Sequence, residues 1–335
     1  MINNGILKNV KKFSKIKLAR GIDLTHANVL YRKKPSNQSN VSMQKYGHIW
    51  FRLTRGNAIF KTYDGAYKPE LKKLRIVNEL IVQELAKQIG IPCALYEPAS
   101  YDDDIGLVTY NFLKENQTLV PLADFLIPNV NYDNNLVDIA DACSFYQMLG
   151  YDIKKEEIIF DMYKDMVLDA LTLQTDRNNY NINLLKDNND YSISVSILFD
   201  NEFAYAIDTV SALVKKGRDI NSVSLLEILD AYSVSAKTLN VQDEMFKPRR
   251  YQKNVQNLVN LAKSNPKMLN FLKNTLKNLS ISKAIENVEA SGVEISNEYK
   301  EYLTRVTRFT KMMFTRELKK PITEDTTYIY DEFIK

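Results

Sequence analysis

The sequence predicts an α+β fold with a small β-rich N-terminal lobe over residues 1–115 and a mostly helical C-terminal lobe over residues 116–335. Before about residue 115, segments of strand-like composition surround one amphipathic helix, whereas beyond it apolar residues recur mainly at helical spacing. The chain has 335 residues, of which 45% are hydrophobic, so it can bury the core of one large two-lobed domain or of two ordinary domains.

The N-terminal lobe is expected to contain a loop followed by a hairpin. Residues 31–44 are polar, rich in Ser and Asn, and include Pro35, which is typical of a loop. Residues 48–53 and 58–63 are aromatic and β-branched, and they flank the turn residues 55–57. They therefore predict two antiparallel strands.

One helix and a second pair of strands complete this lobe. Apolar residues recur every three to four positions from residue 71 to 89, which predicts an amphipathic helix, and Gly90 and Pro92 end it. Residues 93–96 and 107–112 then predict two more strands. The predicted order is strand, strand, helix, strand, strand.

The C-terminal lobe is expected to be mostly helical. The predicted helices cover residues 137–149, 155–175, 225–235, 254–264, 267–278 and 297–319. Residues 180–185 and 191–199 interrupt them as a predicted hairpin, because the second segment alternates between apolar and polar residues.

Charge and cysteine content exclude some classes of protein. The chain has 45 Lys and Arg against 41 Asp and Glu, and this mild excess makes nucleic-acid binding a minor hypothesis. Cys93 and Cys143 both lie among apolar neighbours, which favours buried free thiols of a reducing compartment over a disulfide framework. The two histidines leave little for imidazole catalysis.

The N-terminal segment predicts no cleaved signal. Residues 1–20 are basic but contain no apolar run of signal-peptide length, and no segment approaches the roughly 20 apolar residues that span a bilayer. We expect a soluble protein that is cytosolic where it is made, and export by a route without a cleaved signal peptide stays open.

Three polar side chains near the predicted hairpin have the chemistry of a phosphoryl-transfer site. Asp176 and Asn181 are five residues apart in one loop, and Asp200 follows the second strand of the hairpin. In kinases an Asp orients the attacking hydroxyl, an Asn five residues on holds magnesium, and a second Asp holds magnesium against the nucleotide phosphates. Asp176, Asn181 and Asp200 match this order.

Two residues of the N-terminal lobe complete the pattern. Lys61 lies on a predicted strand, where it would reach the α- and β-phosphates of a nucleotide, and Glu79 lies on the predicted helix, where it would form an ion pair with Lys61. Each alone has an ordinary explanation, since an isolated Lys or Glu is usually a solvated surface residue. The order of all five residues carries the interpretation.

The loop that would cover the phosphates is poor in glycine. Residues 31–47 contain a single glycine, Gly47, so few backbone N–H groups could approach a phosphate closely. Ser39 and Ser42 are predicted to donate hydroxyl hydrogen bonds to the nucleotide instead, and Ser36, Ser39 or Ser42 could accept a phosphate. A plain surface linker is the alternative.

These positions resemble the HipA-like kinases, bacterial serine/threonine protein kinases with an active site related to that of phosphoinositide kinases, and especially their short CtkA-type members. The resemblance covers about residues 40–210 and implies a bilobal protein-kinase-like fold that uses ATP and Mg²⁺. It makes Asp176 the catalytic base, Asn181 and Asp200 the metal ligands, and Lys61 and Glu79 the nucleotide-positioning pair. Asn178 replaces the family's usual His after Asp-Arg, which bears on the hydrogen bonding of the catalytic loop.

The expected function is transfer of phosphate from ATP to a Ser or Thr of a protein substrate, as an autophosphorylating bacterial toxin or effector with an antitoxin or host-protein partner. A small-molecule or lipid kinase, a nucleotidyl transferase and a pseudokinase that only binds partners remain alternatives. A nucleic-acid-binding helical protein is a further one, suggested by Lys247, Arg249, Arg250 and the basic helix over 297–319. Its apolar stripe makes that helix more typical of a core-facing helix with solvated charge opposite.

Overall fold

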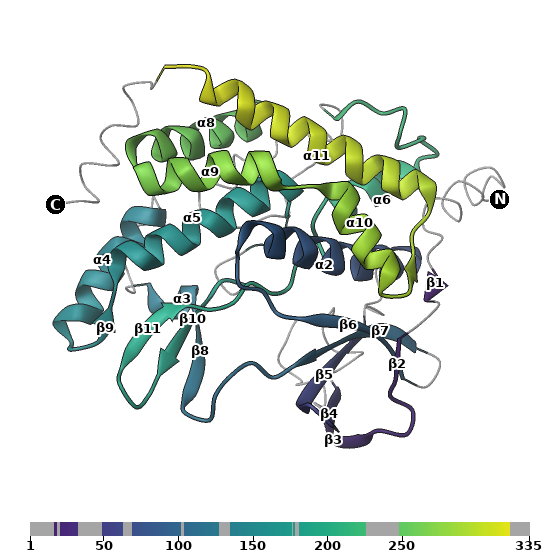
Figure 1. Ribbon diagram of the computed structural model, residues 1–335, viewed down its shortest axis with the longest axis horizontal. Helices are drawn as coiled ribbons and strands as arrows, with labels where there is room; N and C mark the ends of the chain where they lie inside the picture. Colours follow the sequence, from purple (N-terminus) through teal and green to yellow (C-terminus); the bar gives the residue numbers. More distant parts are fainter. Residues whose placement is uncertain are drawn as a thin grey trace.

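The computed structural model describes residues 17–18, 21–32, 49–62, 69–101, 104–126, 135–175, 177, 181–225 and 248–321. Within this part of the chain a six-stranded sheet formed by the N-terminal region lies beside a smaller sheet, and helices of the C-terminal region lie above both (Figure 1). The predicted α+β fold class with a β-rich N-terminal part and a helical C-terminal part is confirmed.

The larger sheet has the strand order β2-β6-β7-β5-β4-β3. Its strands are β2 (Ile22–Asp23), β3 (Asn28–Arg32), β4 (Ile49–Leu53), β5 (Gly56–Thr62), β6 (Tyr96–Tyr101) and β7 (Asp104–Tyr110). The first predicted strand pair is present as β4-β5 and is antiparallel. The second pair is present as the antiparallel β6-β7, but its strands are displaced: β6 shares only Tyr96 with the predicted strand over 93–96, and β7 begins three residues before the predicted strand over 107–112. The predicted loop starts later than expected, since Tyr31 and Arg32 belong to β3; residues 33–48 lie outside the described residues.

The sheet has a small apolar core of its own. It consists of Leu24, Phe51, Ala58, Phe60, Ala99 and Val108, all fully buried. Phe51 and Phe60 meet edge to face with Tyr101, an arrangement that aromatic rings favour. This cluster fixes β4 and β5 against β6 and β7.

Helix α2 (Pro69–Ile89) lies between this sheet and the C-terminal helices (Figure 1). Its apolar residues are buried around most of its circumference from Leu74 to Ala86, and Gly90, with φ of 72°, ends it as predicted. The side-chain amide of Gln88 donates to the carbonyl of Ser280 (3.0 Å) and accepts from the N–H of Ser280 (2.7 Å). These two bonds join α2 to a segment 192 residues away in the sequence.

The helical part contains α3 (Leu122–Phe125), α4 (Asn135–Met148), α5 (Lys155–Thr172), α6 (Ile207–Lys215), α8 (Pro248–Ser264), α9 (Pro266–Asn278), α10 (Ile281–Ala290) and α11 (Asn297–Leu318). Five of the predicted helices correspond to α4, α5, α8, α9 and α11, with ends shifted by a few residues. Of the helix predicted over 225–235, residues 226–235 lie outside the described part of the chain. The short helices α3, α6 and α10 were not predicted.

The predicted hairpin over 180–199 is present as β10 (Asn183–Asp187) and β11 (Ser192–Val195). It belongs to a four-stranded sheet, order β8-β10-β11-β9, with β8 (Gln117–Pro121) and β9 (Asp152–Ile153). A third, two-stranded sheet pairs β1 (Lys17–Leu18) with β12 (Val293–Glu294).

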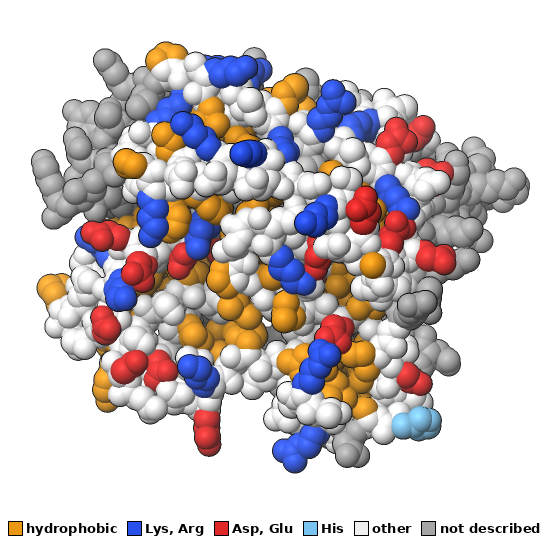
Figure 2. Space-filling view, in the orientation of Figure 1, with side chains coloured by type: hydrophobic (Ala, Val, Ile, Leu, Met, Phe, Trp, Pro, Cys, Tyr) orange, Lys and Arg blue, Asp and Glu red, His pale blue; other side chains and the backbone are white. Residues whose placement is uncertain are grey.

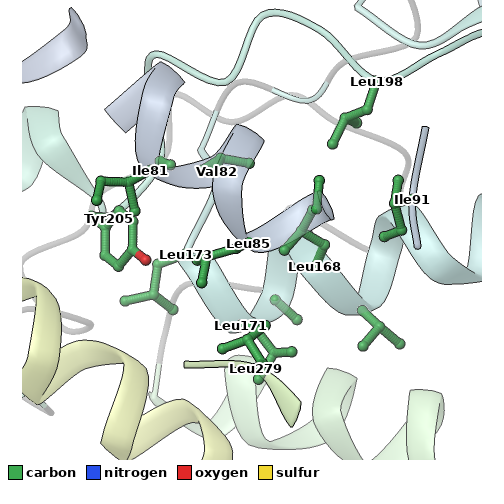
Figure 3. Close-up of a cluster of buried hydrophobic side chains, with 14 of the residues drawn as sticks. Ile81, Val82, Leu85, Ile91, Leu168, Leu171, Leu173, Leu198, Tyr205 and Leu279 are labelled. Carbon is green, nitrogen blue, oxygen red and sulfur yellow. The ribbon is translucent and has the colours of Figure 1, made fainter. Parts of the chain in front are cut away.

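One continuous apolar core joins α2 to the C-terminal helices. Figure 3 shows side chains of α2, among them Ile81 and Leu85, facing Leu168, Leu171 and Leu173 from the end of α5. No helix of the described residues is both long enough and apolar enough to cross a membrane.

Several cations of the predicted basic helix contribute to packing. In α11, Arg305 donates to the carbonyl oxygens of Ile220 (2.5 Å) and Asn221, and Lys311 donates to the carbonyl oxygen of Leu279 (2.8 Å). The apolar stripe, including Leu303 and Val306, is buried as predicted. Lys247 and the side chains of Arg249 and Arg250 lie outside the described part of the structure.

Candidate active site

The central strand β5 carries Lys61 to the candidate site. Its ammonium contacts Oδ1 of Asp200 and lies 3.1 Å from Oε2 of Glu202, and its side chain is only 17% exposed. On the neighbouring strand β7, Gly106 faces β5 so closely that an added Cβ would lie 2.8 Å from the Phe60 ring and even closer to the Lys61 carbonyl. Only glycine fits this position without displacing the backbone of Lys61.

Glu79 is fully buried on α2 and reaches the same segment as Lys61. Its Oε2 accepts a hydrogen bond from the backbone N–H of Asn201 at 2.7 Å. Burial raises the pKa of this carboxyl to about 7, the charge of Lys61 opposes the rise, and the nearby acids Asp200 and Glu202 add to it. The predicted ion pair between Lys61 and Glu79 is not among those of the described residues: Lys61 pairs with Asp200 and Glu202 instead. Glu79 positions the backbone between those two acids.

Asp200 has an uncommon backbone conformation. Its φ is 62°, in the left-handed region that non-glycine residues seldom adopt, and such strain persists only where the surroundings enforce it. The carbonyl oxygen of Asp200 accepts from Nε2 of Gln174 (3.4 Å), and its N–H donates to the hydroxyl oxygen of Tyr96 (3.5 Å). Together with the bond from Asn201 to Glu79, these contacts hold the Asp200 carboxylate toward Lys61.

A buried arginine connects the end of α5 to this segment. Arg177 is 3% exposed and donates to both carboxylate oxygens of Asp169, at 3.0 and 3.2 Å. It also donates to the Phe199 carbonyl (2.7 Å) and to Oδ1 of Asn201 (2.5 Å). Burial disfavours its charge, but Asp169 more than compensates, so the pKa of Arg177 is raised above its ordinary value.

The loop expected to hold the catalytic base is fixed on both sides of Asp176. The Thr175 hydroxyl donates to the Phe203 carbonyl at 3.0 Å, and Arg177 makes the contacts to Phe199 and Asn201. Asp176 and Asn178 lie outside the described residues, so their side chains are not placed. The predicted nucleotide-binding residues Ser39 and Ser42, together with Ser36, also lie outside them.

Asn181 precedes β10 by two residues and is half-buried. Because β10 and β11 are antiparallel, the residues before β10 and those after β11 leave the hairpin at the same end. The N–H of Ser196 donates to the Asn183 carbonyl (3.0 Å), which extends the pairing toward Asp200. Asn181 and Asp200 therefore flank the same end of the hairpin.

The charges of the site fit a divalent cation. The Lys61 ammonium contacts the carboxylates of Asp200 and Glu202, and the carboxyl of Glu79 is close enough to interact with all three charges. Burial and repulsion between these acids raise the pKa of Glu79 and Glu202. Oxygen ligands from Asp200 and Asn181 match the preference of Mg²⁺. Among the described residues, no three His, Cys, Asp or Glu side chains form a metal site by themselves.

Sequence reasoning did not single out Glu202 or Arg75. Arg75, on α2, lies 3.8 Å from Glu202, 3.8 Å from Asp208 and 4.3 Å above the ring of Phe203. The available signal for Glu202 was its position, because it is an acidic residue two positions after Asp200. No pattern marked Arg75, because its role depends on α2 packing against residues more than 100 positions away.

Comparisons with known proteins show the fold. The chain is similar in structure to the proinflammatory kinase CtkA of Helicobacter pylori, with a TM-score of 0.61 and 16% sequence identity over 90% of this chain and 99% of that one. It is also similar to the HipA structure from the Shewanella oneidensis toxin–antitoxin complex with HipB and operator DNA, with a TM-score of 0.48 and 14% identity over 85% of this chain and 65% of that one. No protein-family model and no curated protein sequence matches the chain. The first likeness supports a kinase-like fold.

Proposed function

We propose that the protein is an ATP- and Mg²⁺-dependent serine/threonine protein kinase of HipA-like type. The observation that carries the proposal is the convergence of Lys61 from β5, Glu79 from α2 and Asp200 from the segment after β11. Phosphoryl transfer requires that phosphates, metal and acceptor hydroxyl be held in line with their charge neutralised. These residues provide charges of both signs at one place between the sheet and the helical part.

In the proposed reaction each side chain has one task. Lys61 binds the α- and β-phosphates of ATP, and Glu79 fixes the backbone that presents Asp200. Asn181 and Asp200 would hold Mg²⁺, which supplies charge neutralisation at the phosphates when bound. Asp176 accepts the proton of the Ser or Thr hydroxyl as its oxygen bonds to the γ-phosphorus and the bond from that phosphorus to the oxygen of ADP breaks.

The proposal extends to the biological role, location and autophosphorylation of the protein. The likeness to a proinflammatory bacterial kinase supports a bacterial toxin or effector that acts on a protein substrate, with an antitoxin or a host protein as partner. It would work in the bacterial cytoplasm or after export into a host cell, and it would phosphorylate itself within residues 36–42. A small-molecule or lipid kinase and a nucleotidyl transferase would use the same charged residues, and a pseudokinase would keep only the binding step.

The test is incubation of the purified protein with γ-labelled ATP and Mg²⁺, alone and with a generic protein substrate. Asp200→Ala is expected to lower label transfer about 100-fold or more, because it removes a metal ligand at the transferred group. Arg218→Ala, an exposed substitution in the loop after α6, is the matched control and is expected to retain transfer. Equal labelling by the wild type and Asp200→Ala would refute the assignment, and bound nucleotide without transfer would favour the pseudokinase.

A further inference from the structure

Charge is distributed unevenly along the chain. Residues 245–285 contain nine of the 45 Lys and Arg residues and none of the 41 Asp and Glu residues. The remainder of the chain therefore carries more acidic than basic residues, although the whole chain has a net charge of +4. In the structure this acid-free segment forms α8, α9 and the first turn of α10.

The exposed side of α9 contains no acidic residue. Beyond Pro266, its exposed positions are occupied only by Lys and Asn, with Lys273 and Lys277 one turn apart and Asn274 beside them. Lys283, in the first turn of α10, continues the exposed cations. The apolar residues Met268 and Leu272 point the other way and are buried.

A second stripe of exposed residues runs along α11. Arg308, Met312, Thr315 and Lys319 follow each other at spacings of four, three and four residues, so they share one face of the helix, and all four are exposed. The one acid in the second half of α11, Glu317, is buried between Arg316 and Lys320. The bond from Lys311 to the Leu279 carbonyl joins α11 to the end of α9.

Both stripes belong to one surface, which we call the basic face and define by Lys273, Lys277, Lys283, Arg308, Met312 and Lys319. Figure 2 shows Lys and Arg side chains gathered over the region where α9 and α11 run, with hydrophobic side chains between them. The Asp and Glu side chains visible in that view lie to the right of this region and below it.

We propose that the basic face docks on an anionic lipid bilayer. Cations near such a surface gain electrostatic attraction, and an apolar side chain among them gains from entering the headgroup region. Met312 is 57% exposed at the centre of the α11 stripe, where it fits a lipid surface better than a sugar-phosphate backbone. Single-stranded nucleic acids are commonly bound by exposed aromatic rings that stack on bases, and Met312 is the one large exposed hydrophobic residue of α9–α11.

The test is co-sedimentation of the full chain with phosphatidylcholine vesicles with or without phosphatidylserine, over a range of salt concentrations. Each cation near the surface contributes about a fivefold increase in partitioning, so Lys273→Gln/Lys277→Gln is expected to lower it about 25-fold. Arg308→Gln/Lys319→Gln, on the other helix, is expected to lower it by a similar factor. Lys154→Gln/Lys216→Gln removes the same charge from exposed positions outside the basic face and is expected to have little effect.

Three results would overturn the proposal. Absence of binding to anionic vesicles at low salt is one, and equal loss of binding in the Lys154/Lys216 control is another. The third is binding of duplex or single-stranded DNA at the basic face without binding of vesicles, which would assign the surface to nucleic acid. None of these measurements depends on phosphoryl transfer.

Discussion

Asp169→Asn should destabilise the protein strongly, because it leaves the charge of Arg177 buried without its carboxylate. The pair is bidentate, at 3.0 and 3.2 Å, and its side chains are 3% and 6% exposed. Breaking a buried pair by changing one partner costs about 3–5 kcal/mol, and Asn keeps one acceptor, so we expect about 3 kcal/mol. That is a large part of the roughly 5–15 kcal/mol by which domains are stable.

The assay is urea denaturation followed by circular dichroism, with Asp161→Asn as the matched control. Asp161 pairs with Lys164 on the same helix at 2.6 Å, but its side chain is 41% exposed, so that substitution should cost at most about 1 kcal/mol. Asp169→Leu/Arg177→Met should cost less than the two single substitutions together, because no charge is left buried. If Asp169→Asn unfolds at the same urea concentration as Asp161→Asn, the reasoning is wrong.

Three further changes test other parts of the structure. Glu202→Gln should tighten nucleotide binding several-fold in the absence of metal, because the Glu202 carboxylate competes with phosphates for Lys61. Titration with a fluorescent ATP analogue measures this affinity, and an unchanged affinity would contradict the competition. Gly106→Ala should cost about 1–3 kcal/mol in urea denaturation and weaken binding of the same analogue, because its Cβ would displace the Lys61 backbone; wild-type values for both would show that the strands adapt freely. Burial, with the nearby Asp169, raises the pKa of Asp165 from 3.8 to about 8. The folded state therefore keeps a proton that the unfolded state releases, and stability should fall as the pH rises from about 4 to about 8. Asp165→Asn should lessen that decline in urea titrations at several pH values, and parallel curves for the two proteins would argue against a raised pKa.

The elements that carry Lys61 and Glu79 could be predicted because their signals are local. Aromatic and β-branched residues on both sides of the turn residues 55–57 indicate the hairpin that contains β5, and apolar residues at three- to four-residue spacing indicate α2. Each side chain was therefore assigned to the correct element. The order and spacing of Asp176, Asn181 and Asp200 around the predicted hairpin were likewise evident from the sequence. The catalytic and metal-binding roles given to these residues stay predictions.

The contacts that hold the site together could not be predicted in the same way. Arg177 belonged to a motif whose pattern gave it no task, and charged residues are seldom buried, so nothing suggested its bonds to Asp169 and Asn201. Glu202 becomes a partner of Lys61 only when a segment 141 residues further along the chain returns to β5. Such pairings depend on tertiary packing rather than on local spacing.

Helix α2 packs against the C-terminal helices, so α11, late in the chain, helps to position the site residues that lie early in the chain. The hydroxyl of Tyr299, on α11, donates to the side chain of Asn78, which is 221 residues away and directly precedes Glu79. Asn78 in turn donates to the carbonyl of Ala204 (2.7 Å), just beyond Asp200. A fragment that ends at residue 225 would keep all five residues of the proposed reaction and still lose the support that brings them together. The geometry of the candidate site thus depends on contacts that reach from α2 to α11, and these contacts restrict movement of α2 on its own.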